Sequence, residues 1–390
     1  MSKRIAILGS TGSIGCSTLD VIEHLGPPYR VTALSAHRQI DKLLDQVRRH
    51  RPPVVAVTDE PSAQKIARPL RELGIELLTG PGAMVELAQR SDVDIVLAAV
   101  VGAAGLPAAM AAVAAGKTLA LANKESLVCA GSLLIPLARK NGVPILPVDS
   151  EHSAVFQAMQ CGRGHEVKRV ILTASGGPFR TATLDQIRNA SLADALNHPT
   201  WKMGGKITID SATMFNKALE LIEACWLFDL PPEKIEIVIH PESIVHSMVE
   251  FVDGSVIAQL SPPDMKTPIQ YALTYPHRLP GSSPKLDLTK PFQFRFEPPD
   301  LDRFPAIRLA YEVARKGGTA GAVLNAANEA AVSAFTSGKI AFGTISHLVE
   351  LALNLHDVQH NPSLDDLLAA DHWARVTVEN LIQTHEAAVV

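Results

Sequence analysis

The sequence predicts an α/β protein with a Rossmann-like, parallel-sheet N-terminal domain, a second, α+β domain and a small all-helical C-terminal domain. Up to residue 149, apolar strands alternate with helix-length segments, which is typical of βαβ units and a parallel sheet. Between residues 150 and 275, strands and helices are mixed and a hairpin signal occurs. After residue 305, apolar residues recur at helical spacing, which predicts helices alone.

Residues 1–149 are predicted to form the first domain. Its candidate strands are RIAILG, RVTALS, PVVAVTD, IELLT, DIVLAAV, TLALAN and PILPVD. The segments between the strands carry apolar residues at helical spacing, and one example is the series Ile14, Leu19, Ile22 and Leu25. The domain is therefore expected to be a parallel sheet with helices between its strands.

One uncharged segment in this domain, Ile95–Gly116, is long enough to span a bilayer. It is mostly alanine and glycine, however, and Pro107 lies near its middle. A buried strand, a glycine loop and an alanine-rich helix explain this composition better. We therefore expect no membrane span and no membrane partner.

Residues 150–275 are predicted to form the second domain. It contains the strand KRVILTAS, the turn GGPF, a polar stretch LNHPTWKMGGK and one helix over SATMFNKALELIEACWLF. The pair Asp253-Gly254 between two alternating runs predicts a β-hairpin. The proline- and charge-rich residues 276–305 predict a linker, and residues 306–390 the helical C-terminal domain.

The composition excludes several classes of protein. Of the 390 residues, 47% are apolar and 19% charged, as in ordinary folded proteins. The formal net charge of −4 indicates neither a nucleic-acid-binding protein nor a membrane-surface protein. The 4 cysteines form no C-x-x-C pair, which favours reduced thiols in a cytoplasmic protein over a disulfide framework or a zinc site.

The segment ILGSTGSIG places Gly9, Gly12 and Gly15 directly after the first strand and at the start of the first helix. A tight turn and the close approach of a pyrophosphate both exclude a Cβ, and a helix N-terminus offers free N–H groups. A purely structural turn is the alternative. The following strand at the right spacing favours nucleotide binding.

The end of the second strand indicates which nucleotide is bound. NAD sites usually place an acid there to bind the ribose 2′-hydroxyl, but this chain has His37 and Arg38. A guanidinium suits a 2′-phosphate, so NADP(H) is favoured. An ordinary solvated Arg38 is the alternative.

Acidic residues gather in PVDSEHSAVF, where a strand gives way to a helix. Ser150 is a good N-cap and acids suit a first helical turn, so Asp149 and Glu151 could simply begin a helix. They could also form half of a site for a hard metal, which Glu220 on a later helix would complete. Three carboxylates with open positions favour Mg²⁺ or Mn²⁺. Glu223, one turn beyond Glu220, is a rival ligand.

A polar cluster surrounds Glu220 in the sequence. Asn216, Lys217 and Glu220 share one face of the predicted helix, and Ser211 lies just before it. A surface ion pair is the usual explanation of a Lys and a Glu at this spacing. With Asn and Ser donors nearby, the cluster also suits a phosphate.

Several long motifs resemble the 1-deoxy-D-xylulose 5-phosphate reductoisomerase family. They are GSTGSIG, LANKESLV, PVDSEHSA, TASGGPF, HPTWKMG, DSATMFNKALELIEA and IHPESIVHSMVEF, and they lie between residues 9 and 251. The resemblance implies an NADPH- and metal-dependent enzyme of the non-mevalonate isoprenoid pathway. It would convert 1-deoxy-D-xylulose 5-phosphate to 2-C-methyl-D-erythritol 4-phosphate, in a catalytic domain over residues 150–275. A homodimer is implied as well.

The resemblance also assigns roles to residues. The implied metal ligands are Asp149, Glu151 and Glu220, which with Lys124 form the catalytic set. The implied substrate-binding residues are Lys124, Ser150, Glu151, Ser175, His198, Trp201, Ser211, Asn216, Lys217 and Glu220, of which His198 and Trp201 belong to a flexible lid near residues 197–206. The implied cofactor-binding residues are Thr11, Gly12, Ser13, Ile14, His37, Arg38, Gln39, Asn123, Glu125, Gly204 and Met265. His246 is also implied near the active site.

One motif departs from the family. Members commonly have Ala-Gly-Lys/Arg-Asn after the second strand, and this chain has Ala36-His37-Arg38-Gln39. The basic residue remains, so NADPH preference is expected to remain. The pocket for the adenosine is expected to differ in shape.

Two other functions fit the glycine loop. A different NADPH-dependent dehydrogenase with a similar domain order would need no site of three carboxylates. A non-catalytic nucleotide sensor would bind NADPH without turnover, and it leaves DSATMFNKALELIEA unexplained.

Overall fold

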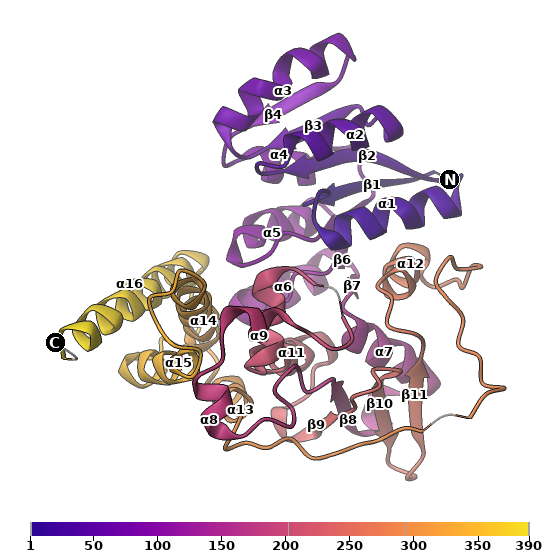
Figure 1. Ribbon diagram of the computed structural model, residues 1–390. Helices are drawn as coiled ribbons and strands as arrows, with labels where there is room; N and C mark the ends of the chain where they lie inside the picture. The colour runs from indigo at the N-terminus through magenta and orange to yellow at the C-terminus, as the bar shows by residue number, and fades with distance from the viewer. Residues whose placement is uncertain (1, 202, 292, 389–390) are drawn as a thin grey trace. The chain divides into compact units, whose positions relative to one another are not determined.

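The computed structural model describes residues 2–201, 203–291 and 293–388 (Figure 1). The chain divides into two compact units. Unit 1 comprises Met1–Ser126, Leu134–Ser153 and Asp264–Lys285, and unit 2 comprises Leu127–Leu133, Ala154–Pro263 and Leu286–Val390. Each unit therefore joins segments that are distant in the sequence.

Unit 1 is built on a seven-stranded parallel sheet with the order β4-β3-β2-β1-β5-β6-β7. β1 pairs with both β2 and β5, so the strand order reverses beside β1, where open α/β sheets bind ligands. β3 and β5 are buried throughout, as expected for parallel strands covered on both faces. The strands are β1 (Lys3–Leu8), β2 (Tyr29–Ala36), β3 (Val54–Val57), β4 (Glu76–Thr79), β5 (Ile95–Ala98), β6 (Thr118–Leu121) and β7 (Ile145–Pro147).

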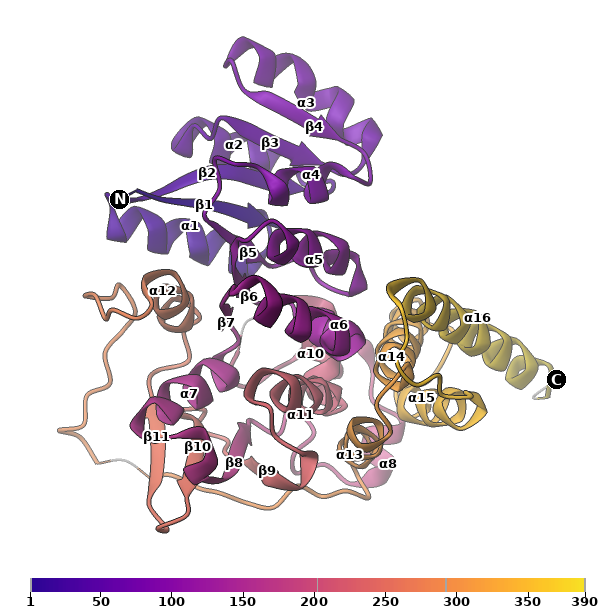
Figure 2. The ribbon, with the colours of Figure 1, turned by 180° about the vertical axis from the view of Figure 1, so that it is seen from behind.

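Helices cover both faces of this sheet, with α1 and α2 on one face and α4 and α5 on the other (Figures 1 and 2). α12 returns from a distant part of the chain to pack against α1, and Lys266 Nζ lies 2.9 Å from Asp20 Oδ2. The helices are α1 (Ser13–Leu25), α2 (Ile40–His50), α3 (Glu60–Glu72), α4 (Ala83–Gln89), α5 (Leu106–Ala114) and α12 (Lys266–Thr274). Two further helices, α6 (Glu125–Asn141) and α7 (Ser150–Ala158), contain residues of both units.

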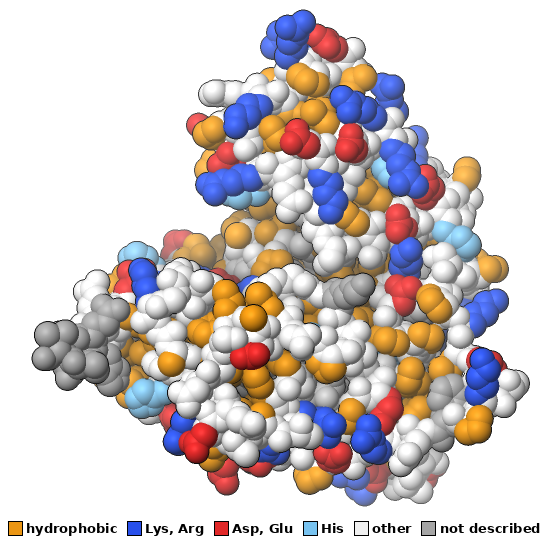
Figure 3. Space-filling model, viewed as in Figure 1, with side chains coloured by type: hydrophobic (Ala, Val, Ile, Leu, Met, Phe, Trp, Pro, Cys, Tyr) orange, Lys and Arg blue, Asp and Glu red, His pale blue; other side chains and the backbone are white. Residues whose placement is uncertain are grey.

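The uncharged segment Ile95–Gly116 folds as predicted. It forms β5, a 3₁₀ turn at Ala103–Gly105 and α5. None of the described helices is long and apolar enough to cross a membrane. On the face of unit 1 seen in Figure 3, acidic and basic side chains are interspersed. One ion pair of this unit joins Arg68 Nε to Glu72 Oε1 at 2.8 Å.

Unit 2 contains a four-stranded mixed sheet with the order β11-β10-β8-β9. β10 is antiparallel to β8 and to β11, whereas β8 and β9 are parallel. The predicted hairpin is confirmed at β10–β11, where Gly254 has a φ of +87° and Phe251 N donates to Ser255 O. The strands are β8 (Val167–Ala174), β9 (Ile235–Ile239), β10 (Val245–Phe251) and β11 (Val256–Leu260).

The prediction of a single helix over SATMFNKALELIEACWLF is wrong. The structure has two helices, α10 (Gly205–Ala212) and α11 (Phe215–Phe228), which are separated at Met214. Met214 has a left-handed φ of +63° and is 2% exposed, so burial of its side chain overrides the helical propensity of the sequence. Thr213 Oγ1 donates to Ile209 O at 3.1 Å and so satisfies a carbonyl at the end of α10.

The C-terminal helices are α13 (Ala306–Lys316), α14 (Ala320–Thr336), α15 (Thr344–Leu355) and α16 (Leu364–Ala388). α14 is mostly buried and packs against α15 and α16. Short helices complete unit 2 at α8 (Leu184–Arg188), α9 (Leu192–Leu196) and the 3₁₀ turns Met159–Cys161, Gly164–Glu166 and Pro232–Lys234. The predicted fold class is confirmed: a Rossmann-like parallel sheet, a second sheet with helices, and a helical C-terminal part.

The proline-rich residues 276–305 form no helix or strand among those described. Glu297 makes an isolated β-bridge with Ile239 at the end of β9. Beside this bridge, His240 is fully buried, its Nδ1 lies 2.9 Å from Arg295 O, and its ring stacks on Phe296. These contacts attach the segment to the mixed sheet.

Candidate active site

The glycine loop of unit 1 joins the carboxyl end of β1 to α1. Gly9 has a φ of +82°, and a Cβ there would lie 2.8 Å from Ala99 O. A Cβ at Gly15 would lie 2.5 Å from Gly9 O, because the loop folds back onto the first turn of α1. Only glycine fits at both positions. The loop contains the predicted cofactor residues Thr11, Gly12, Ser13 and Ile14 and exposes a helix N-terminus that suits a pyrophosphate.

The predicted adenosine-side residues follow β2. His37 Nδ1 lies 2.9 Å from Thr58 Oγ1, and Arg38 Nε donates to Asp59 Oδ1 at 3.2 Å. Gln39 is the residue that precedes α2. Hydrogen bonds from Ser62 and Arg38 lower the pKa of the Asp59 carboxyl, despite some desolvation. The Arg38 side chain is 73% exposed, so its guanidinium remains accessible.

A buried junction follows β6. Asn123 Nδ2 donates to Gly102 O at 3.0 Å and to Glu125 Oε2 at 2.8 Å, and Asn123 Oδ1 accepts Ser126 N at 2.9 Å. Asn123 and Glu125 are 3% and 4% exposed. These bonds attach the start of α6 to the loop after β5, which also borders the glycine loop. The structure thus gathers Asn123 and Glu125 at the carboxyl edge of the sheet.

Lys124 and Asp149 meet at the same edge, because β6 and β7 are neighbours. Lys124 Nζ lies 2.9 Å from Asp149 Oδ2. Ser150 Oγ donates to Glu151 Oε2 at 2.6 Å, so four predicted site residues lie together at the start of α7. Ser153 N donates to Asp149 O, which makes Asp149 the residue that precedes the helix, rather than the predicted cap Ser150.

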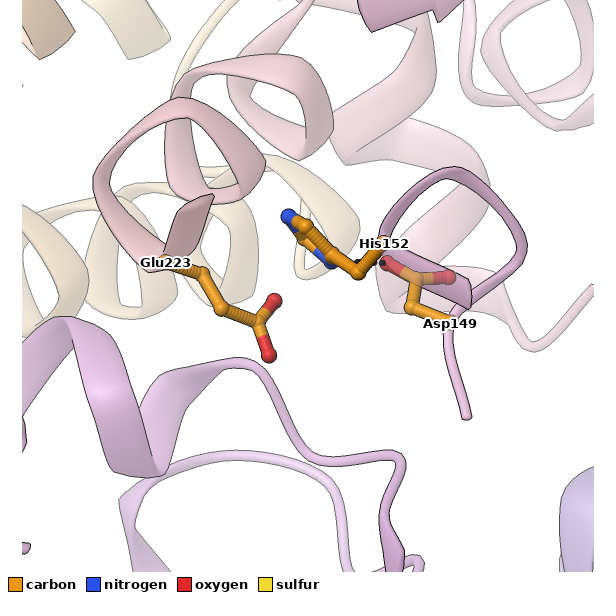
Figure 4. A group of neighbouring side chains, drawn as sticks. All are labelled: Asp149, His152 and Glu223. Atoms are coloured by element: carbon orange, nitrogen blue, oxygen red, sulfur yellow. Dashed lines mark ion pairs between the residues drawn. The ribbon is translucent and has the colours of Figure 1, made fainter. Parts of the chain in front are cut away.

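His152 is not among the predicted site residues. It is fully buried, and its Nδ1 lies 3.8 Å from Asp149 Oδ2 (Figure 4). The ring therefore limits where the Asp149 carboxylate can lie. The spacing of three residues from Asp149 on a helix was the available signal. Figure 4 also draws Glu223, which projects from α11.

In unit 2, the turn after β8 lies against the end of α10. Gly177 has a φ of +64°, and a Cβ there would lie 2.6 Å from Ser211 O. Gly177 N donates to Ser175 Oγ at 3.2 Å. The close approach that this glycine permits brings the predicted residues Ser175 and Ser211 to the same place.

His198 lies beside the same turn. Its Nδ1 accepts Thr200 N at 3.1 Å and Trp201 N at 2.9 Å, so the ring proton is on Nε2, which lies 3.0 Å from Ser175 Oγ. Burial lowers the pKa of His198, which favours this neutral form. The rings of Trp201 and His246 are 6.1 Å apart, so His246 lies near the predicted lid. Lys202 of that lid lies outside the described residues.

The polar face of α11 is buried. Asn216 Nδ2 donates to Glu220 Oε1 at 2.5 Å, and Lys217 forms an ion pair with the other Glu220 oxygen. Lys217 is 3% exposed and Glu220 is fully buried. This is not the surface ion pair of the alternative interpretation. The Lys217 ammonium and the Asn216 amide together bind the Glu220 carboxylate, and the same two donors are of the kind that bind a phosphate.

The remaining predicted residues lie at helix starts. Gly204 precedes α10 in unit 2, and Met265 precedes α12 in unit 1, the helix that packs against α1. The predicted site residues thus fall into two polar groups, according to the unit that contains them. Unit 1 holds the glycine loop, Asn123 to Glu125 and Asp149 to Glu151, and unit 2 holds Ser175, His198, Ser211 and the polar face of α11.

Models of one known protein family match most of the chain. The model of the 1-deoxy-D-xylulose 5-phosphate reductoisomerase family matches residues 5–131, and the models of its two C-terminal domains match residues 145–228 and 260–377. The chain belongs to this family. A reductoisomerase of Geobacter sp. strain M21 is 50% identical over 97% of this chain and 99% of its own, and that of Chlorobaculum tepidum is 50% identical over 97% and 100%.

Solved structures of the family have the same fold. A reductoisomerase crystallised with NADPH, fosmidomycin and magnesium is 43% identical, with a TM-score of 0.93 over 98% of this chain and 99% of its own. The Zymomonas mobilis enzyme in complex with NADPH is 45% identical, with a TM-score of 0.92 over the same shares.

Proposed function

We propose that this chain catalyses the NADPH- and divalent-metal-dependent conversion of 1-deoxy-D-xylulose 5-phosphate to 2-C-methyl-D-erythritol 4-phosphate. The membership of nearly the whole chain in the reductoisomerase family carries this proposal. The two polar groups support it, because each contains the residue types that the reaction needs. A different dehydrogenase would give no reason for the buried polar face of α11.

Asp149, Glu151 and Glu220 are proposed as the metal ligands. All three side chains are carboxylates, the ligand type that Mg²⁺ and Mn²⁺ prefer. The reductoisomerase that was crystallised with magnesium supports the choice of ion. A bound divalent cation would polarise the substrate carbonyl and stabilise the negative oxygen that forms during rearrangement.

The partners of these carboxylates have separate tasks. Lys124 Nζ holds Asp149 by its contact at 2.9 Å and carries a proton that can be donated to a substrate oxygen. Asn216 and Lys217 hold the carboxylate of Glu220 on its two sides, so its oxygens keep a fixed orientation. Because these carboxylates are already held in place, they need to move little when negative charge develops on the substrate oxygen.

The phosphate is proposed to bind in unit 2. Ser175, Ser211, Asn216 and Lys217 offer hydroxyl, amide and ammonium donors. His198 orients Ser175, since its Nε2–H points at the hydroxyl. Residues 197–206 are proposed as the lid, with His198 and Trp201 closing over the substrate. Phosphate binding far from the reacting carbons can drive that closure and exclude water from the hydride acceptor.

NADPH is proposed to bind at the glycine loop of unit 1. A Cβ at Gly9 or Gly15 would collide with protein backbone, so these glycines permit the tight strand-to-helix turn that leaves the N-terminus of α1 open to a pyrophosphate. Arg38 lies at the end of β2 with an exposed guanidinium, where a 2′-phosphate would be bound. Asn123, Glu125 and Met265 are proposed on the nicotinamide side.

We further propose a cytoplasmic homodimer. β11 is an edge strand of the mixed sheet; its first residue, Val256, is 48% exposed, and Val252 in the preceding hairpin turn is 66% exposed. An apolar edge of this kind is suited to burial against a second copy. Sedimentation of the purified protein tests this, and a monomer at micromolar concentration contradicts it.

The test of the function is an assay of the purified chain with 1-deoxy-D-xylulose 5-phosphate, followed by NADPH absorbance. We expect NADPH oxidation that stops when the metal is chelated and returns with Mg²⁺ or Mn²⁺. NADPH binding without turnover would instead favour a nucleotide sensor. Turnover that survives chelation would favour a metal-independent dehydrogenase.

A further inference from the structure

Helix α10 is attached to the C-terminal helices by a buried polar cluster of unit 2. The Asp210 carboxylate is 1% exposed. One of its oxygens lies 2.8 Å from Lys206 Nζ, and the other accepts Asn328 Nδ2 at 2.8 Å. Asn328 is fully buried on α14, 118 residues further along the chain. A buried carboxylate is costly unless its oxygens are bonded, so this contact defines where α10 can lie.

The cluster is adjacent to the proposed phosphate site. Asp210 directly precedes Ser211, whose carbonyl lies against Gly177 in the turn that carries Ser175. α10 has only eight residues and no side-chain cap at its start. A helix this short is not stable by itself, so its tertiary contacts determine its place.

The α14 side of the contact is itself held in place. Arg375 Nη2 on α16 donates to Glu329 Oε2 at 2.7 Å, and Glu329 directly follows Asn328. Asn325 Nδ2, one turn earlier on the same helix, donates to the other oxygen of Glu329 at 3.2 Å, a bond within α14 that attaches it to no other element. Asn325 and Asn328 are both fully buried, but only Asn328 has a hydrogen bond to α10 among the bonds of the described residues.

We propose that Asp210 is a positioning residue for the phosphate site. Bound by Lys206 and Asn328, it holds α10 against α14 and so keeps Ser211 beside Ser175. The inference rests on the proposed function for the role of Ser211. It also assigns a task to the C-terminal helices, which are the fixed support for α10.

The test compares two alanine variants of the full-length protein, Asn328→Ala and Asn325→Ala. Both remove a buried amide from α14, but only the first removes a bond to α10. We expect Asn328→Ala to raise the KM for 1-deoxy-D-xylulose 5-phosphate about ten-fold and to leave the KM for NADPH within about two-fold. Asn325→Ala is expected to lower the melting temperature and leave both KM values unchanged.

A reciprocal exchange tests whether the bond itself matters. Asp210→Asn alone should raise the KM for the sugar phosphate. Combined with Asn328→Asp, it restores a carboxylate–amide bond between α10 and α14, although Lys206 then faces an amide, so part of the loss should be recovered. Equal KM values for the sugar phosphate in Asn328→Ala and the wild type would overturn the proposal.

Hydrogen exchange separates this inference from the proposed function. In the ligand-free protein, the amides of residues 205–212 should exchange about ten-fold faster in Asn328→Ala than in Asn325→Ala. An unchanged exchange rate overturns the positioning role whatever the substrate is. A wild type without turnover, together with faster exchange in Asn328→Ala, would instead refute only the proposed function.

Discussion

Replacing Lys217 by methionine is expected to weaken substrate binding and turnover together. Lys217 is 3% exposed and its ammonium is paired with the fully buried Glu220. A hydrogen bond to a charged group contributes about 1.5–3 kcal/mol, so losing the contact with the phosphate should lower kcat/KM about 10- to 150-fold. Removing one member of a buried ion pair costs about 3–5 kcal/mol, so the free energy of unfolding should fall as well.

The assay is the steady-state oxidation of NADPH with the sugar phosphate as the varied substrate. Melting temperatures and the KM for NADPH show whether the variant is folded and still binds its cofactor. The matched control is Lys168→Met, because Lys168 also pairs with a carboxylate, at 2.7 Å from Glu250 Oε1, but is 58% exposed on the sheet. The control should behave as the wild type. A folded Lys217→Met with wild-type KM and kcat would remove Lys217 from the phosphate site and refute the reasoning.

The glycine loop, the proposed metal ligand Glu220 and the proposed lid residue His198 each give a further prediction. Gly9→Ala places a Cβ 2.8 Å from Ala99 O at a φ of +82°, so the loop must shift and NADPH should bind at least ten-fold more weakly. An unchanged NADPH affinity in a fluorescence titration would contradict binding at the glycine loop. Glu220→Gln keeps the side-chain shape but removes the charge. The Mg²⁺ concentration for half-maximal activity should then rise at least ten-fold, and an unchanged metal titration would favour Glu223 as the ligand. Burial lowers the pKa of His198, so its stabilising contribution is complete above its ordinary pKa of 6.5 and is lost as the pH falls through the folded-state pKa. The difference in unfolding free energy between the wild type and His198→Gln should therefore shrink below about pH 6.5, and a difference independent of pH would be inconsistent with a neutral ring.

Local patterns predicted much of the fold and of each polar group. Gly9 and Gly15 were predictable because a tight strand-to-helix turn excludes a Cβ at fixed spacing. Asn216, Lys217 and Glu220 were predictable because residues three and four apart share a helical face. Their burial was not visible in the sequence, since the same pattern occurs on solvent-exposed helices.

Features that depend on distant parts of the chain could not be predicted. The break at Met214 depends on where its side chain is buried, while its neighbours favour a continuous helix. The Asp210–Asn328 contact joins residues 118 apart, and nothing local marks either as a partner. Residues 264–285 pack with the N-terminal unit although they follow the mixed sheet in the sequence, because α12 packs against α1.

We propose that Asp149, Glu151 and Glu220 bind one divalent cation. Diffraction from crystals soaked with Mn²⁺ tests it most directly, because anomalous scattering locates the ion independently of the protein atoms. We predict one strong peak with an oxygen of each of the three carboxylates at about 2.2 Å, a distance typical of oxygen ligands to small divalent cations. A fully occupied Mn²⁺ bound elsewhere, with none of the three carboxylates among its ligands, would refute this assignment.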